Sequence, residues 1–349
     1  ASNNVAVGVA ALEANTTGTE NVAVGASALT DNTTNGYNTA VGFESLKVNT
    51  TGNKNTAVGR KSLAANTTGI ENVAVGYDCL DANTTASGNT AIGKSALGAN
   101  TTGASNTSVG KSALQLNTTG ANNTASGFEA LRYNTTGARN VAIGEGALYS
   151  NTTATNNTVI GTYAGDGVTT GIANILIGYQ AGKYNTPLTT GTENTIIGAY
   201  AYPSASDTSS ANALGYNIIA VSGYTTIGSA TNDIRAAHGN TTWATVSDER
   251  YKKDITTSTA GLSFINDLTP RTWNYKTLGE LPETFSAYKA DSTEVFKNTQ
   301  TNHGFIAQEV KAVIDNHSEI KDGFRLWDDR PDGSQEVAEA ALIPVLVKA

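Results

Sequence analysis

The chain has 349 residues and a formal net charge of −8, and its charged residues are unevenly distributed. Residues 1–246 contain 13 acidic and 10 basic side chains, whereas residues 247–349 contain 17 and 12. The mildly negative charge of both parts argues against a nucleic-acid partner, and no apolar run reaches the ~20 residues of a membrane-spanning helix. The single cysteine, Cys79, excludes an intrachain disulfide.

A repeat of 17 residues runs through the first two-thirds of the chain. Each copy begins with an asparagine that is followed four residues later by glycine, and residues 55–70 of one copy read NTAVGRKSLAANTTGI. The register shifts by a three-residue insertion near Pro187 before the copy that begins at Asn194. The chain has no methionine and opens partway into a repeat, which is typical of a fragment or a processed product. The asparagines in register are Asn4, Asn21, Asn38, Asn55, Asn72, Asn89, Asn106, Asn123, Asn140, Asn157 and Asn174.

Each copy divides into three pieces. The N-[VT]-A-[VI]-G piece is rich in β-branched residues and predicts a short strand. A leucine such as Leu46 or Leu63 supplies one large apolar anchor. The N-T-T-G piece predicts a turn, with asparagine and glycine in left-handed backbone and threonine bonded back to the main chain. So small a unit buries no face alone, so the copies must stack, and the sequence predicts a mainly β fold with a parallel β-solenoid shaft.

The strands of the repeat are apolar on both faces, because alanine and Val or Ile occupy adjacent positions. We expect the Val and Ile column, with the leucine, to fill the thin interior, and the alanine column to face outward. A row of small apolar side chains suits the close approach of another subunit, which predicts a symmetric oligomer around a common axis. The alternative is a monomeric solenoid with an alanine-lined surface.

The repeat resembles the head repeats of YadA-type trimeric adhesins over about residues 1–198, which implies a β-roll in a homotrimer. Other functions of the turn have weaker support in the sequence. The Asn15-Thr16-Thr17 sequence and its equivalents match a glycosylation acceptor, but a turn that recurs with the fold explains them. The regular threonine column would also suit ice or polysaccharide binding, although one Thr-Thr pair per coil is equally what a turn needs.

The composition changes beyond the repeat. Residues 199–246 predict a β connector, and residues 247–349 predict a small α+β domain. Within this domain, apolar residues around Phe264 suit a helix that ends before Pro270, and PRTWNY suits a strand. HGFIAQEVKAVI has helical spacing, with Phe305, Ile306, Val310 and Val313 on one face, and the terminal ALIPVLVKA suggests a third helix after Pro344.

The segments SDERYKKDI, TPRTWNY, GFIAQEV and LIPVLVKA occur in this order and resemble the C-terminal intramolecular chaperone of phage tail spikes and fibres, the peptidase S74 family. The resemblance implies a module that trimerises, aligns three chains and then cuts itself off between Ser247 and Asp248. It places a serine–lysine dyad on Ser247 and Lys252, with Asp248 and Arg250 in support. Tyr251 stands where the family usually has leucine, which leaves the polar positions of the motif intact.

The chemistry of such a dyad is sound, because a desolvated lysine amine can take the proton of a serine hydroxyl. The alternative is that Lys252, with its charged neighbours, forms a solvated surface. His238, His303 and His317 are scattered without metal-ligand spacing, so we expect no metal. The glycines fit solenoid corners instead of a phosphate loop, so we expect no cofactor.

The sequence favours a homotrimeric phage tail fibre or spike, located on the virion, that attaches to a glycan or protein receptor on the host surface. It predicts self-cleavage at most, and no enzyme with turnover. A bacterial cell-surface trimeric adhesin with the same chaperone is the alternative. A capsule-degrading hydrolase is disfavoured, because the repeat holds no recurrent carboxylate pair at a cleft.

Overall fold

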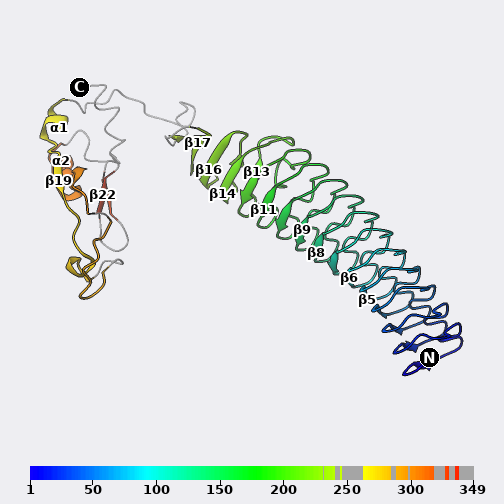
Figure 1. Cartoon of the computed structure of the whole chain (residues 1–349). Coiled ribbons are helices and arrows are strands. Elements are labelled where there is room, and N and C mark those ends of the chain that lie inside the picture. Colours follow the sequence, from blue (N-terminus) through cyan, green and yellow to red (C-terminus); the bar gives the residue numbers. More distant parts are fainter. Residues whose placement is uncertain are drawn as a thin grey trace. The chain divides into compact units, whose positions relative to one another are not determined.

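The structure is a computed structural model that describes residues 1–230, 232–239, 244–245, 262–283, 288–297, 299–317, 327–329 and 335–337. Its contacts divide the chain into two compact units, Ala1–Ser247 and Asp248–Ala349. The first unit is a solenoid in which each coil adds one strand to a continuous parallel ladder (Figure 1). This confirms the predicted mainly β fold with a repetitive shaft.

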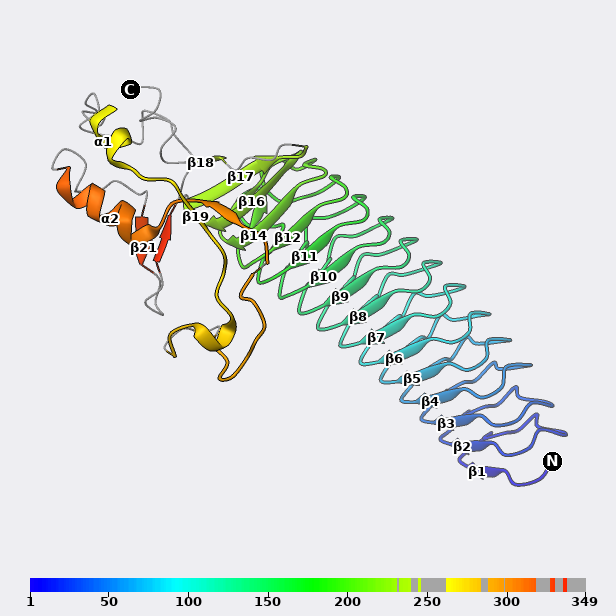
Figure 2. The same ribbon diagram turned by 60° about the vertical axis from the view of Figure 1, so that its left-hand side comes forward.

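Twelve three-residue strands form the regular part of the ladder, and each is paired in parallel with the next in register, as Val73↔Thr90 shows. They line up along one side of the solenoid (Figure 2). The strands are β1 (Val5–Val7), β2 (Val22–Val24), β3 (Thr39–Val41), β4 (Thr56–Val58), β5 (Val73–Val75), β6 (Thr90–Ile92), β7 (Thr107–Val109), β8 (Thr124–Ser126), β9 (Val141–Ile143), β10 (Thr158–Ile160), β11 (Ile175–Ile177) and β12 (Thr195–Ile197).

The ladder continues beyond the regular repeats. β14 (Asn212–Tyr216) and β16 (Tyr224–Ser229) extend it in parallel. β17 (Asn232–Ala237) then pairs antiparallel with β16, and β18 (Ala244–Thr245) pairs antiparallel with β17. A second, two-stranded sheet joins β13 (Tyr202–Pro203) to β15 (Ile219–Ala220). The antiparallel strands therefore lie at the end of the parallel stack.

The strand faces are the reverse of what the sequence led us to expect. The middle residue of each strand from β2 to β12, such as Ala57 or Ala91, is fully buried, whereas the Val and Ile residues on either side are half-buried or exposed. The alanine column thus faces the interior and the Val and Ile column faces outward. The reason is volume: a buried leucine already fills each thin coil, and closely packed interiors leave room for only a methyl group opposite it.

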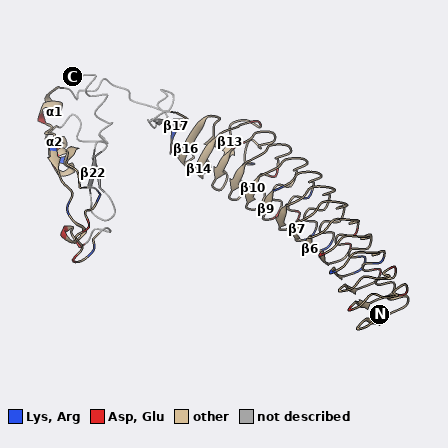
Figure 3. Cartoon of the chain, in the orientation of Figure 1, with Lys and Arg blue, Asp and Glu red and all other residues tan. Residues whose placement is uncertain are grey.

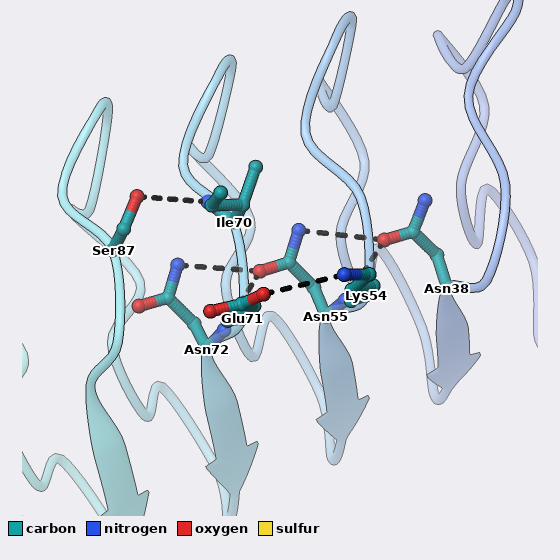
Figure 4. Close-up of polar contacts among 7 residues, drawn as sticks. All are labelled: Asn38, Lys54, Asn55, Ile70, Glu71, Asn72 and Ser87. Atoms are coloured by element: carbon teal, nitrogen blue, oxygen red, sulfur yellow. Dashed lines mark hydrogen bonds and ion pairs between the residues drawn. The ribbon is translucent and has the colours of Figure 1, made fainter.

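Two ladders of buried asparagines hold the coils in register. In the first, which begins each repeat, Asn72 donates its backbone N–H to Asn55 Oδ1 at 3.0 Å and its Nδ2 to the same oxygen at 3.2 Å (Figure 4). In the second, from the turn, Asn66 Nδ2 donates to Asn49 Oδ1 at 2.9 Å. A buried polar group left unpaired costs about 1–3 kcal/mol, so each amide favours a neighbouring coil with an asparagine at the same position.

The corners of the coil also differ from expectation. The left-handed residues include the buried leucines, such as Leu46 at φ 51° and Leu97 at φ 54°, and not the turn asparagines of the regular 17-residue coils. The turn threonine bonds between coils: Thr67 Oγ1 donates to the carbonyl oxygen of Thr84 at 3.0 Å. The predicted turn is present. Its asparagine side chain both closes the turn, with Asn66 Nδ2 donating to the carbonyl oxygen of Gly69 at 3.0 Å, and connects successive coils, whereas its threonine side chain bonds to the next coil.

The interior changes its composition late in the shaft. Gly165 and Gly182 replace the leucine of earlier coils, and Leu176 takes the place of an inward alanine. A Cβ atom on Gly165 would lie 2.7 Å from Leu176 Cδ1, so the large side chain has moved from one wall to the other. The predicted insertion is confirmed, because Asn194 bonds to Asn174 across 20 residues, and Leu188 from this longer coil is fully buried.

The second unit contains α1 (Leu262–Asp267), β19 (Arg271–Trp273), the short 3₁₀ helix η2 (Leu278–Glu280), β20 (Asn302–Gly304), α2 (Ala307–Asn316), β21 (Trp327–Asp329) and β22 (Gln335–Val337). β19 pairs antiparallel with β20, and β21 with β22. The predicted helix before Pro270 and the strand after it are confirmed. The next helix begins only at Ala307 and buries Val310 and Ile314, so Phe305 and Ile306 precede it. The helix predicted after Pro344 lies outside the described residues.

Candidate functional site

An uncharged surface runs along the shaft on the outward side of its strands. We call this surface, formed by the first and third residues of β1–β12, the outer strand face. These twelve strands, which the structure describes in full, contain no charged residue, and their labelled ribbons are tan in Figure 3. Most of the third residues are Val or Ile; Ile92 is 42% exposed and Ile143 is 41% exposed.

This face has the chemistry of a subunit interface. Valine and isoleucine at the same place in successive coils give one continuous apolar column, broken only by Ser126. Contiguous apolar patches of this kind on soluble proteins mark interaction sites. The sequence pattern had shown two apolar faces but assigned the wrong one to the interior. The signal that was missed is volume, since alanine is the smaller residue and must share the interior with leucine.

An ion pair connects a strand to a helix in the second unit. Arg271 on β19 donates from Nε and Nη2 to the two carboxylate oxygens of Glu309 on α2, at 2.9 and 3.0 Å. The same hydrogen bonds hold the pKa of Glu309 below its ordinary value and the pKa of Arg271 above its own. Two parallel bonds fix the orientation of both side chains, so this contact sets the angle between strand and helix.

A small apolar core lies beside this ion pair. Phe264 on α1 is fully buried, and Val310 and Ile314 on α2 are nearly so. His317, just after α2, stacks edge-on against the Phe264 ring at 5.4 Å and lies 2.8 Å from Asp267 Oδ2. The contacts of α1 with α2 therefore combine a shared apolar core with one polar contact at the edge.

The predicted self-cleavage residues Ser247, Asp248, Arg250 and Lys252 lie outside the described residues, so their dyad stays a prediction. Burial raises the pKa of the Cys79 thiol to about 12, which keeps this side chain protonated and unreactive. Within the described ranges, no group of three or more His, Cys, Asp or Glu side chains is placed to hold a metal ion. No described helix is long and apolar enough to cross a membrane.

Comparison with known proteins supports one of the two resemblances. Residues 247–319 match the model of the peptidase S74 family, described as the chaperone of endosialidase. The match covers the start of the second unit, from the proposed cleavage motif to just beyond α2. Neither the curated proteins nor the solved structures include a significant match to this chain. A segment similar to this chaperone family, joined to a solenoid shaft, fits a trimeric fibre or spike protein.

Proposed function

We propose that this protein is a homotrimeric fibre or spike of a bacteriophage tail, located on the virion, that attaches to a receptor on the host surface. The outer strand face carries the trimer proposal. Its side chains recur in every coil, so three parallel shafts in register would bury them along the whole length. At about 25 cal/mol per Å² of apolar surface buried, such a long interface supplies a large driving force.

The repeated shaft creates a problem of register that the second unit would solve. Three shafts displaced by one whole coil would still bring Val and Ile columns together, because successive coils are nearly alike. The match to a chaperone family lies directly after the shaft. If the three C-terminal units associate first, they fix one register and raise the effective concentration of the shafts.

The chaperone would then leave by a single cut. The Lys252 amine takes the proton of the Ser247 hydroxyl, and the hydroxyl oxygen attacks the carbonyl carbon of the bond between Ser247 and Asp248. An ester forms as the carbon–nitrogen bond breaks, the departing Asp248 nitrogen takes the proton from Lys252, and one water then hydrolyses the ester. The products are a carboxylate on Ser247 and an amino group on Asp248. The reaction occurs once per chain and leaves the shaft kinetically trapped in its trimeric register.

Denaturing mass spectrometry tests this cut. The purified wild-type chain should give two products, residues 1–247 and 248–349, and the Ser247→Ala variant should stay intact. A Lys253→Met variant is the matched control, because it removes a neighbouring amine and should still be cut, whereas Lys252→Met should not. An intact wild-type chain would show that the module stays attached.

A further inference from the structure

Aromatic side chains gather on one edge of the late coils. Nine of the 14 tyrosines fall between Tyr133 and Tyr224. Most of them lie in the segment after the glycine that ends each strand. We call this surface the tyrosine edge; it consists of Phe128, Tyr133, Tyr149, Tyr163, Tyr179, Tyr184, Tyr200, Tyr202 and Tyr216.

The rings of the tyrosine edge contact one another across coils. Tyr133 and Tyr149 meet edge to face at 5.0 Å. Tyr200 makes the same kind of contact with Tyr179 at 5.2 Å and with Tyr184 at 4.9 Å. Tyr179 and Tyr184 are nevertheless each 43% exposed. The ring contacts hold the tyrosines in place while leaving ring surface open to a ligand.

A hollow of about 230 Å³ opens on this edge. Gly146 lies in its wall, with left-handed backbone at φ 59°, and a Cβ atom there would lie 2.6 Å from Tyr163 Cδ1. The ring of Tyr163 therefore occupies space that a side chain fills in most other coils. The residues around the hollow are Phe128, Glu129, Glu145, Gly146, Tyr149, Tyr163 and Asp166.

Polar contacts fix the wall of the hollow. The Tyr163 hydroxyl donates to Glu145 Oε1 at 2.7 Å, and this bond raises the pKa of Tyr163. Lys183 lies 4.8 Å from the centre of the same ring and pairs with Asp166. The ring is thus held at its hydroxyl end and over one face, so the hollow is already formed before a ligand binds.

The lining combines aromatic rings with three carboxylates. Arg132 pairs with Glu129, and Lys183 pairs with Asp166. A sugar ring presents an apolar C–H face that fits against an aromatic ring, and its hydroxyls donate to carboxylate oxygens. The three carboxylates outnumber these two basic side chains, so the net negative charge would disfavour an anionic sugar. Successive coils are spaced ~4.8 Å apart, so a chain of sugar units would meet further tyrosines as it runs along the shaft.

We propose that the hollow and the tyrosine edge bind a neutral saccharide chain. This inference rests on the attachment role proposed above and names the ligand class that the role requires. The site needs no second copy of the chain, because one chain supplies every residue of the lining.

Titration calorimetry on the full chain tests the proposal with neutral oligosaccharides of glucose, galactose, mannose, N-acetylglucosamine and rhamnose. A galacturonic acid oligomer of the same length is the anionic control. At least one neutral probe should bind, and Tyr163→Ala should weaken that binding about five- to tenfold through loss of the ring contact. Tyr37→Ala is the matched control. The backbone of Tyr37 is left-handed like that of Tyr163 (φ 63° and 54°), and its exposed side chain lies far outside the tyrosine edge.

The proposal is overturned if no neutral probe binds, if the anionic oligomer binds as tightly, or if Tyr37→Ala weakens binding as much as Tyr163→Ala. Light scattering on each variant measures its mass and shows whether a loss of sugar binding accompanies a loss of assembly. A chain that binds sugar as a monomer would contradict the trimer and leave the saccharide site standing. A trimer that binds no sugar would remove the saccharide site alone.

Discussion

Each of the two units of this protein is stabilised internally by a different kind of contact. In the shaft, the same hydrogen bond recurs at a separation of 17 residues, as from Asn72 to Asn55 and from Asn89 to Asn72. In the second unit, Arg271 reaches Glu309 across 38 residues and His317 reaches Asp267 across 50. The shaft repeats one set of contacts many times, whereas each contact of the second unit occurs once.

This difference indicates a separate role for each unit in assembly. A repeating surface gives a strong interface but a poor choice of register, since a slip by one coil replaces each contact with a similar one. A unit without internal repetition has one arrangement that satisfies its contacts. The second unit is therefore suited to set the register that the shaft alone cannot select.

The largest effect should come from removing the second unit. A chain that ends at residue 246 should give shafts that associate in mixed registers or aggregate, because nothing aligns the three chains. Light scattering should then show a broad mass distribution. The full-length Ser247→Ala variant, which keeps the unit attached, is the control and should give one mass. An equally uniform trimer from the shortened chain would contradict the register argument.

The next largest effect should come from a charge on the outer strand face. Ile92→Asp should reduce the fraction of trimer strongly, because assembly would bury three carboxylates in an apolar interface. Thr102→Asp puts the same charge at an exposed turn position of the same coil and should leave the trimer intact. Native mass spectrometry at equal protein concentration compares the two, and equal trimer fractions would exclude this face as the interface.

Truncation of a buried leucine should weaken the shaft without redirecting its assembly. Leu97→Ala should lower the free energy of unfolding by about 2–5 kcal/mol, because it removes a fully buried side chain and leaves a cavity. Leu116→Ala, at a position that is 38% exposed, should change it by less than about 0.5 kcal/mol. Denaturant unfolding followed by circular dichroism measures both, and similar losses would contradict the assigned interior.

The smallest effect concerns the ion pair of the second unit. Arg271 holds the pKa of Glu309 below 4.5, so this carboxylate contributes stability above the unfolded pKa, and the contribution is lost as the pH falls through the lowered value. Carbon-13 NMR titration of Glu309 should show the lowered pKa, and Arg271→Gln should restore the ordinary one. Arg271→Lys should restore only part, because it keeps the charge and loses the paired geometry. An unchanged pKa in Arg271→Gln would show that the pair does not form.

Much of the shaft could be predicted from the sequence, because period, strand composition and turn residues all indicated one stacked coil. The insertion near Pro187 was visible as a shift in register. The inward face was predicted wrongly, since alternation shows that a strand has two faces and only volume decides which is buried. Gly165 takes the place of a leucine where Leu176 takes the place of an alanine, because the interior has a fixed volume. Only the structure shows that the two positions meet.

The candidate site was predictable in a different way. The family match supports the position of the chaperone module, whereas the roles of Ser247 and Lys252 stay predictions. The tyrosine edge was present in the sequence as a local excess of tyrosine, but its hollow depends on Gly146 lying next to Tyr163 in the neighbouring coil. That contact follows from the path of the chain around the corner and not from composition.

The mass of the assembled protein in solution tests the central claim most directly. Multi-angle light scattering on the freshly purified Ser247→Ala chain should give three times the 35.9 kDa of one chain. That mass should persist on dilution, because the outer strand face would be buried along the whole shaft. A mass of one chain at micromolar concentration would show that this face is exposed to solvent, and would contradict the trimeric fibre.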